Sequence, residues 1–181
     1  MQRFDIINQL IELCKFTSYL EIGTRSGDCF KQIRCASKEC VDIEKNYAEL
    51  TYHMSSDDFF KQNTKTYDII FIDGNHEEEF VFRDIENSLK ILNLGGYIVC
   101  HDCLPTKAEH LLPNSYIYTG TVYSAVINIQ RKYPELDVKV IDTDFGVGLI
   151  TRRIANPTYQ KIPFDVFDTE RSSFFHIVSI K

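Results

Sequence analysis

The sequence of this chain has little of what marks non-globular proteins. Only 8 of its 181 residues are glycine and 5 are proline, and it contains no internal repeat or low-complexity segment. Hydrophobic residues make up 44% of the chain and charged residues 25%, which is an ordinary globular profile. These proportions exclude disordered and fibrous proteins, and the length predicts one domain with a sizeable core.

Long uncharged apolar runs are also absent. No stretch approaches the roughly 18 apolar residues that span a bilayer. The first 16 residues, MQRFDIINQLIELCKF, have apolar side chains at helical spacing, and acids interrupt them. This pattern differs from the unbroken apolar core of a signal peptide. We therefore expect a cytoplasmic protein without a membrane partner.

Dense clusters of basic residues are missing as well. The chain has 20 lysines and arginines against 26 acids, for a net charge of -6. Nothing in it could follow a phosphate backbone, so we expect no nucleic-acid partner. The sequence leaves the oligomeric state undetermined.

The six cysteines include no second CxxC pair beyond Cys100 and Cys103. Zinc would need two further ligands, and a redox CxxC would follow an early strand and precede a helix. We interpret the cysteines as reduced core residues of a cytosolic protein. In the CHDC motif, the candidate functional residues are therefore His101 and Asp102, which lie between the two cysteines.

Apolar runs alternate with amphipathic segments along the chain. They predict helices at 1–16, 28–34, around Tyr47, at 77–92 and from Val122 to Pro134, with strands at 18–23, 40–43, 51–54, 67–73, 97–100, 137–142 and 146–152. Such alternation is typical of an α/β fold with a mainly parallel sheet and helices on both faces. The last two strands suggest an antiparallel hairpin at one edge.

We expect a single domain in three parts. These are an N-terminal helix (1–16), a core (17–152) and a C-terminal tail (153–181), with a packed helix from Phe164. The loop 104–120 is long enough to be a functional lid.

Polar residues and glycines stand where the predicted strands end, and in an open parallel sheet ligands bind at that edge. Glu21, Gly23 and Gly27 form an ExGxxxG turn. Glycine lets the backbone approach a ligand, and the acid suits an ammonium or sulfonium. Asp42, 19 residues after Gly23, lies where an acid accepts hydrogen bonds from ribose hydroxyls, with Glu44 as its rival.

The motifs LEIGTRSG, VDIEKN, SSDDFF, YDIIFIDGNH, LNLGGYIVCHDCLP and DTDFGVGLI follow one another in order. This series resembles the class I S-adenosylmethionine-dependent methyltransferases over about residues 17–152. It is most similar to a branch of small-molecule and sugar O-methyltransferases with IDGxH and HD at strand ends. The resemblance implies a Rossmann-like, doubly wound sheet of seven strands, with S-adenosylmethionine as cofactor.

The resemblance also implies roles for individual residues. The implied cofactor-binding residues are Glu21, Gly23, Thr24 and Gly27 beside the methionine part, Asp42 at the ribose, Ser56 and Asp57 at the adenine, and Asp73 next to the methyl group. A divalent cation would be held by Asp73, His101 and Asp102. The cation could be Mg²⁺ or Mn²⁺; because His101 replaces an oxygen acid, Mn²⁺ or another metal that accepts imidazole fits this set better than Mg²⁺.

Catalysis has two alternatives at this stage. A cation bound at Asp73 and Asp102 could activate the acceptor hydroxyl. Alternatively His76, three residues after Asp73, could remove its proton without a metal. The catalytic candidates are therefore Asp73, His76 and His101, although His76 could instead cap the helix that follows it.

We predict a methyltransferase that acts on an oxygen of a small molecule or sugar; the sequence does not decide between an oxygen and a nitrogen acceptor. One alternative is a non-catalytic S-adenosylmethionine-binding or scaffold module. A weaker one is a nicotinamide-dependent oxidoreductase, which Glu21 and Arg25 disfavour because they break the GxGxxG fingerprint.

Overall fold

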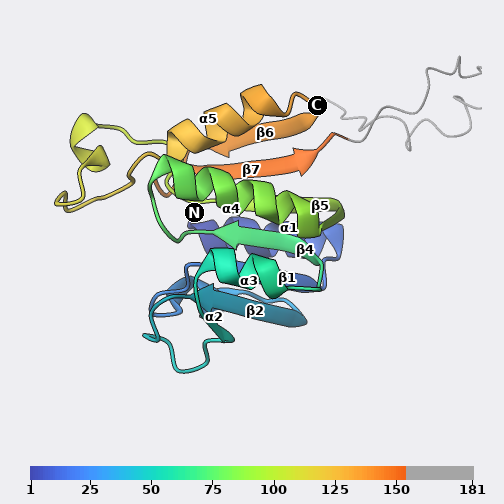
Figure 1. Ribbon diagram of the computed structural model, residues 1–181. Helices are drawn as coiled ribbons and strands as arrows, with labels where there is room; N and C mark the ends of the chain where they lie inside the picture. The colour runs from blue at the N-terminus through green and yellow to red at the C-terminus, as the bar shows by residue number, and fades with distance from the viewer. Residues whose placement is uncertain (154–181) are drawn as a thin grey trace, which may run out of the picture.

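The computed structural model describes residues 1–153, so the predicted helix from Phe164 lies outside the described residues. Its centre is a seven-stranded sheet with the order β3-β2-β1-β4-β5-β7-β6 (Figure 1). The strands are β1 (Ser18–Ile22), β2 (Ser37–Asp42), β3 (Tyr52–His53), β4 (Tyr67–Ile72), β5 (Leu92–Cys100), β6 (Leu136–Ile141) and β7 (Val147–Arg152). The first five pair in parallel, and β7 runs antiparallel to both β5 and β6. The predicted α/β class and C-terminal hairpin are confirmed.

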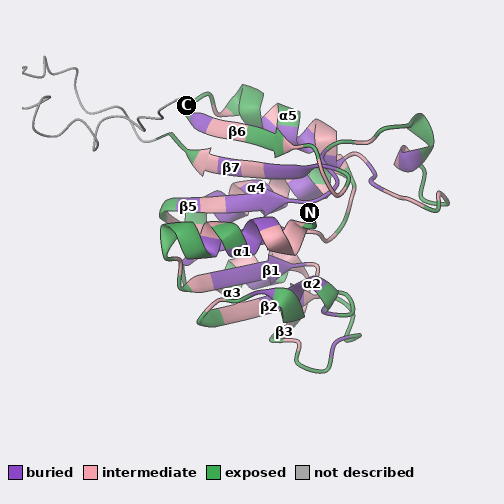
Figure 2. Cartoon of the chain, turned by 180° about the vertical axis from the view of Figure 1, so that it is seen from behind, coloured by how far each residue is buried: buried purple, intermediate pink, exposed green. Residues whose placement is uncertain are grey.

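Helices cover both faces of the sheet. They are α1 (Arg3–Cys14), α2 (Asp28–Gln32), α3 (Ser56–Gln62), α4 (Glu78–Ile91) and α5 (Val122–Lys132). Residues of α1 and α2 share one core cluster, and residues of α3, α4 and α5 share the other. Figure 1 shows α3, α4 and α5 in front of the sheet, and Figure 2 shows α1 on the opposite side.

The central strands are buried on both faces, which explains their unbroken apolar sequences. Leu20 of β1 and Ile70 and Phe71 of β4 are fully buried. Figure 2 shows buried residues concentrated in the central strands, while the outer sides of the helices are exposed. The polar residues that follow these strands therefore lie where the buried strands end, at the carboxyl ends of the parallel strands.

Several local predictions differ from the structure, among them the start of β2, which lies at Ser37 rather than Cys40. The segment around Tyr47 is not a helix, because its ring instead packs edge-on against Phe30 and over Gly27. Strand β5 begins at Leu92 rather than Tyr97. The helix α3 was not predicted as such; Ser55 caps it by accepting a hydrogen bond from the backbone N–H of Asp58.

Among residues 1–153, no helix is both long and apolar enough to cross a bilayer.

Several segments meet at the edge formed by the carboxyl ends of the parallel strands. The start of the chain lies beside the arrowhead of β4 in Figure 1, and the loop 104–120 projects from the same side. That loop carries a short 3-10 helix, η1 (Ala108–Leu111). Its far end is fastened to the turn after β4, because the backbone N–H of Thr121 donates to the carbonyl of His76 at 2.8 Å.

Candidate active site

The turn after β1 touches the turn after β4 through two glycines. Gly23 has φ +84, and a Cβ added to it would lie 2.3 Å from the Cα of Gly74. Gly27 also has positive φ, +76, and the Tyr47 ring lies over it. Only glycine permits both the positive φ and the close contact. The turn predicted from the sequence therefore requires glycine at these two positions.

Glu21 lies beneath this turn with a side chain that is almost completely buried. The residue is 1% exposed, and its carboxyl accepts a hydrogen bond from the Tyr19 hydroxyl. Burial raises the pKa of Glu21 from 4.5 to about 8, against the lowering effect of that hydrogen bond. Near neutral pH the group therefore keeps its proton, and a ligand cation beside it would favour the charged form.

This raised pKa predicts a pH-dependent stability. A carboxyl whose folded pKa is raised stabilises the fold fully below its unfolded pKa, and that contribution is lost as pH rises through the folded value. Wild-type unfolding free energy should therefore fall between pH 4.5 and about pH 8. In Glu21→Gln the free energy of unfolding should decrease over this pH range by a few kcal/mol less than in the wild type, since one pKa unit is worth about 1.4 kcal/mol.

Urea unfolding between pH 6.5 and 8.5 measures the effect. Burial also raises the pKa of Asp84, to about 6, so that carboxyl titrates mostly below this pH range. The exposed Glu12 provides the matched control, Glu12→Gln, which should follow the wild type. Equal pH slopes for wild type and Glu21→Gln would show that Glu21 is already ionised at neutral pH.

The residues expected to hold an adenosine lie along the neighbouring strand ends. Asp42 is fixed by backbone N–H groups of Arg25 at 2.7 Å and Glu44 at 2.8 Å. Thr24 is buried, and within the described chain its hydroxyl oxygen has no hydrogen-bond partner. An orphaned buried hydroxyl beside a glycine turn fits a site that a polar ligand completes.

Ser56 and Asp57 lie in the first turn of α3, and both side chains interact with α4. Asp57 forms an ion pair with Arg83 at 2.8 Å, and the Ser56 hydroxyl hydrogen-bonds the carboxyl of Asp84. The predicted contacts of Ser56 and Asp57 with adenine therefore remain predictions.

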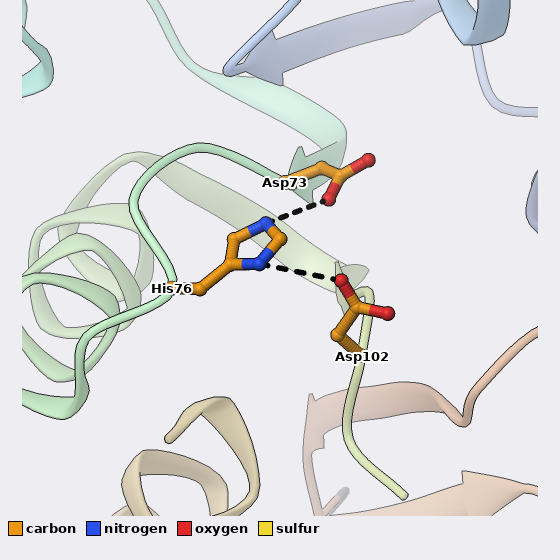
Figure 3. Close-up of side chains that lie close together, drawn as sticks. All are labelled: Asp73, His76 and Asp102. Carbon is orange, nitrogen blue, oxygen red and sulfur yellow. Dashed lines mark ion pairs between the residues drawn. The ribbon is translucent and has the colours of Figure 1, made fainter. Parts of the chain in front are cut away.

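A cluster of two acids and a histidine lies where β4 and β5 end. His76 Nε2 is 3.5 Å from Asp73 Oδ1, and His76 Nδ1 is 3.5 Å from Asp102 Oδ2. Figure 3 shows the imidazole between the two carboxylates. One ligand atom from each of the three residues lies within 4.8 Å of the others, a spacing that can hold a metal ion.

Contacts from the end of the long loop fix the orientation of His76. Its Nδ1 is 3.1 Å from the carbonyl oxygen of Tyr118, and the two rings stack with centroids 5.4 Å apart. Burial opposes charge on the imidazole, but Asp73 and Asp102 outweigh it and raise the pKa of His76 above 6.5. His76 is thus a stronger base than a free histidine.

His101 belongs to the same cluster but is engaged on both ring nitrogens. Its Nδ1 lies 3.3 Å from a carboxylate oxygen of Asp73 and from one of Asp102, and its Nε2 lies 3.5 Å from Asp144. Although burial opposes its charge, these three acids raise the pKa of His101 to about 11. Because both ring nitrogens of His101 face carboxylates and its pKa is raised, the geometry favours His76 over His101 for binding a proton or a metal.

Two residues of this site escaped the sequence analysis. Asp144, in the turn between β6 and β7, accepts hydrogen bonds from the backbone N–H of Arg3 at 2.8 Å and from Arg3 Nη1 at 3.0 Å. Arg3 Nε is also 3.5 Å from Asp73. The DTDFG turn was visible in the sequence, but no local pattern brings it to the end of β4 or to a residue 141 positions away.

Comparison with known proteins gives a consistent family. The family described as "Methyltransferase domain" matches residues 44–103, which include Asp73, His76 and His101. No curated protein sequence matches this chain.

Solved structures share the fold over most of the chain. Rv0187 from MTB, solved with bound cofactor, has a TM-score of 0.66 and 17% identity, covering 83% of this chain and 79% of its own. The O-methyltransferase from Bacillus cereus, in complex with SAH, has a TM-score of 0.61 and 14% identity, covering 83% and 80%. TomG from Streptomyces achromogenes, an O-methyltransferase of tomaymycin synthesis in complex with SAM, has a TM-score of 0.61 and 15% identity, covering 83% and 79%.

At these identities the structural likeness establishes the fold, and the family match covers residues 44–103. The predicted resemblance to class I methyltransferases is confirmed at the level of the fold. The chain has the class I methyltransferase fold, and residues 44–103 are similar to the methyltransferase-domain family.

Proposed function

We propose that this protein transfers a methyl group from S-adenosylmethionine to a hydroxyl oxygen of a small molecule or sugar. The observation that carries the proposal is the cluster of Asp73, His76 and Asp102 at the ends of β4 and β5. It lies next to the glycine turn, because Gly23 of that turn contacts Gly74. A donor bound along the turn and an acceptor at the cluster would therefore meet.

The cofactor fits the chemistry of the turn. Gly23 and Gly27 leave room for a close approach, Thr24 offers an unpartnered hydroxyl, and Asp42 presents a fixed carboxylate. When bound, S-adenosylmethionine supplies a methyl group on a positively charged sulfur. The protein must then align an oxygen with that methyl group and remove its proton.

His76 is suited to remove the proton. The carbonyl of Tyr118 and the carboxylate of Asp102 both lie near Nδ1, so the neutral imidazole carries its hydrogen there. Nε2 is then the atom that accepts a proton from the acceptor hydroxyl. Asp73, 3.5 Å from Nε2, stabilises the resulting imidazolium.

The same three residues fit a divalent cation. Two carboxylates and an imidazole suit Mn²⁺ better than Mg²⁺, which prefers oxygen ligands. A bound cation would lower the pKa of the acceptor hydroxyl. We therefore propose Asp73, His76 and Asp102 as its ligands in place of the predicted set with His101.

Binding and turnover together test the proposed function. Isothermal titration should show that the purified protein binds S-adenosylhomocysteine. A screen of hydroxylated small molecules and sugars with radiolabelled S-adenosylmethionine should then identify an acceptor. Cofactor binding without transfer to any acceptor would favour the scaffold alternative, and no cofactor binding by folded protein would refute the proposal.

The metal has a test of its own. We expect Mn²⁺ to bind wild-type protein, and Asp102→Asn to weaken that binding by at least about tenfold, the effect of losing one charged ligand contact. Asp58→Asn is the matched control, because Asp58 is exposed at α3 and, within the described part of the chain, its side chain pairs only with Lys61 and Ser55. Excess EDTA should reduce transfer; full activity in EDTA would leave His76 as a metal-free base.

A further inference from the structure

The N-terminal end of α1 lies at the crevice, and its first residue, Arg3, extends into the charged cluster. The side chain contacts Asp144, Asp73 and His101, which belong to three different segments beyond the strand ends. It is 26% exposed. Arg3 therefore brings a fixed positive charge to the place where a ligand would lie.

The guanidinium of Arg3 is not saturated by these contacts. A guanidinium carries N–H donors on all three nitrogens. Among the described residues, Nη1 donates to Asp144 at 3.0 Å, whereas Nε is buried without a hydrogen-bond partner and Nη2 makes no hydrogen bond. The contact of Nη1 with His101 Nε2, at 3.5 Å, is longer than the bond to Asp144.

The surroundings of Arg3 favour an anion on its unoccupied side. Asp73 lies 3.5 Å from Nε and Asp144 lies 3.0 Å from Nη1, so neither acid is paired with Nη2. Glu21, whose pKa the charge of Arg3 lowers, is buried, and burial raises its pKa to about 8. The twelve-residue helix α1 adds the positive end of its dipole at this position.

We propose that Arg3 binds a ligand carboxylate at the end of α1, namely the α-carboxylate of the amino-acid part of S-adenosylmethionine. This inference rests on the proposed function, and it assigns the anchor for one end of the cofactor. The charge of Arg3 lowers the pKa of both Glu21 and Cys29, which places it close to β1 and α2, where the glycine turn begins. A charge-assisted hydrogen bond to a carboxylate is among the stronger polar contacts.

The experiment compares two ligands that differ only in the carboxylate. Isothermal titration measures S-adenosylhomocysteine and its decarboxylated analogue against wild type, Arg3→Ala and Arg3→Lys. Arg34→Ala is the matched control, because Arg34 is exposed and hydrogen-bonds through its backbone rather than its side chain. Thermal unfolding of each variant shows whether it is folded.

Arg3→Ala should weaken S-adenosylhomocysteine binding on the order of 10- to 100-fold, the range for hydrogen bonds to charged groups. Its affinity for the decarboxylated analogue should stay within about twofold of wild type, and Arg3→Lys should be intermediate for the carboxylate ligand. If Arg3→Ala does not fold, the comparison of Arg3→Lys with wild type decides in the same way.

A variant that weakens both ligands equally, or neither, would overturn the assignment of Arg3. That result is distinct from a failure of the proposed function, in which wild-type protein binds neither ligand.

Discussion

Replacing His76 with alanine is expected to reduce the rate constant of methyl transfer by about 10²- to 10⁴-fold, the usual contribution of a general base. Affinity for S-adenosylhomocysteine should change little, because His76 lies on the acceptor side of Asp73. The imidazole is held between Asp73 and Asp102 and oriented by Tyr118, and the alanine variant lacks this positioned Nε2.

The pH profile gives a second readout for His76. The base must be neutral, so wild-type activity should rise with pH through a pKa above 6.5. The alanine variant should lose this rise even where residual activity remains. His53→Ala is the matched control, since His53 is exposed and, among residues 1–153, its side chain hydrogen-bonds only the carbonyl of Ile43.

An unchanged profile in the alanine variant would exclude His76 as the base. A large loss of Mn²⁺ binding in the same variant would instead assign its effect to metal ligation. The two measurements therefore separate the two roles that the geometry allows.

Replacing Gly23 with alanine is expected to lower the free energy of unfolding by more than about 3 kcal/mol, in the range of the most damaging substitutions. The new Cβ would lie 2.3 Å from the Cα of Gly74, 2.5 Å from the carbonyl oxygen of Asp73 and 2.5 Å from the nitrogen of Gly74. All three atoms are backbone, so no side chain can turn away, and β1 would have to separate from β4.

Gly95→Ala is the matched control for backbone conformation. Gly95 has φ +79, close to the +84 of Gly23, but a Cβ there would have no heavy atom within 4 Å. Replacing Gly95 with alanine should lower the free energy of unfolding by only about 1–2 kcal/mol, the cost of a left-handed backbone conformation for a residue with a Cβ. Urea unfolding of both variants measures the difference, which isolates the collision from the strain.

Equal destabilisation of the two glycine variants would show that the turns after β1 and β4 can move apart freely. A folded Gly23→Ala protein should also have lost affinity for S-adenosylhomocysteine, because the collision displaces Asp73 and the turn that would hold the cofactor.

The sequence predicted the central strands well because a strand that is buried on both faces has a continuous run of apolar residues. Residues 67–72 are almost continuously apolar, and β4 occupies those positions. The start of β5 has no such apolar run, since the residues from Leu92 to Gly96 are mostly exposed or half-buried. The segment around Tyr47 was predicted wrongly because its conformation depends on the ring packing over Gly27 and against Phe30.

The sequence by itself determined that the polar residues after β4 and β5 meet, because parallel strands end on one side of the sheet and each of these strands is followed by polar residues. Asp73, His76, His101 and Asp102 were all predicted there, and they lie there. It could not determine which histidine is free to react. That was decided by Asp144, which tertiary packing brings to His101 from the turn between β6 and β7. Its charge, with those of Asp73 and Asp102, raises the pKa of His101 and leaves His76 as the candidate base, since the state of a buried imidazole depends on all its neighbours in space.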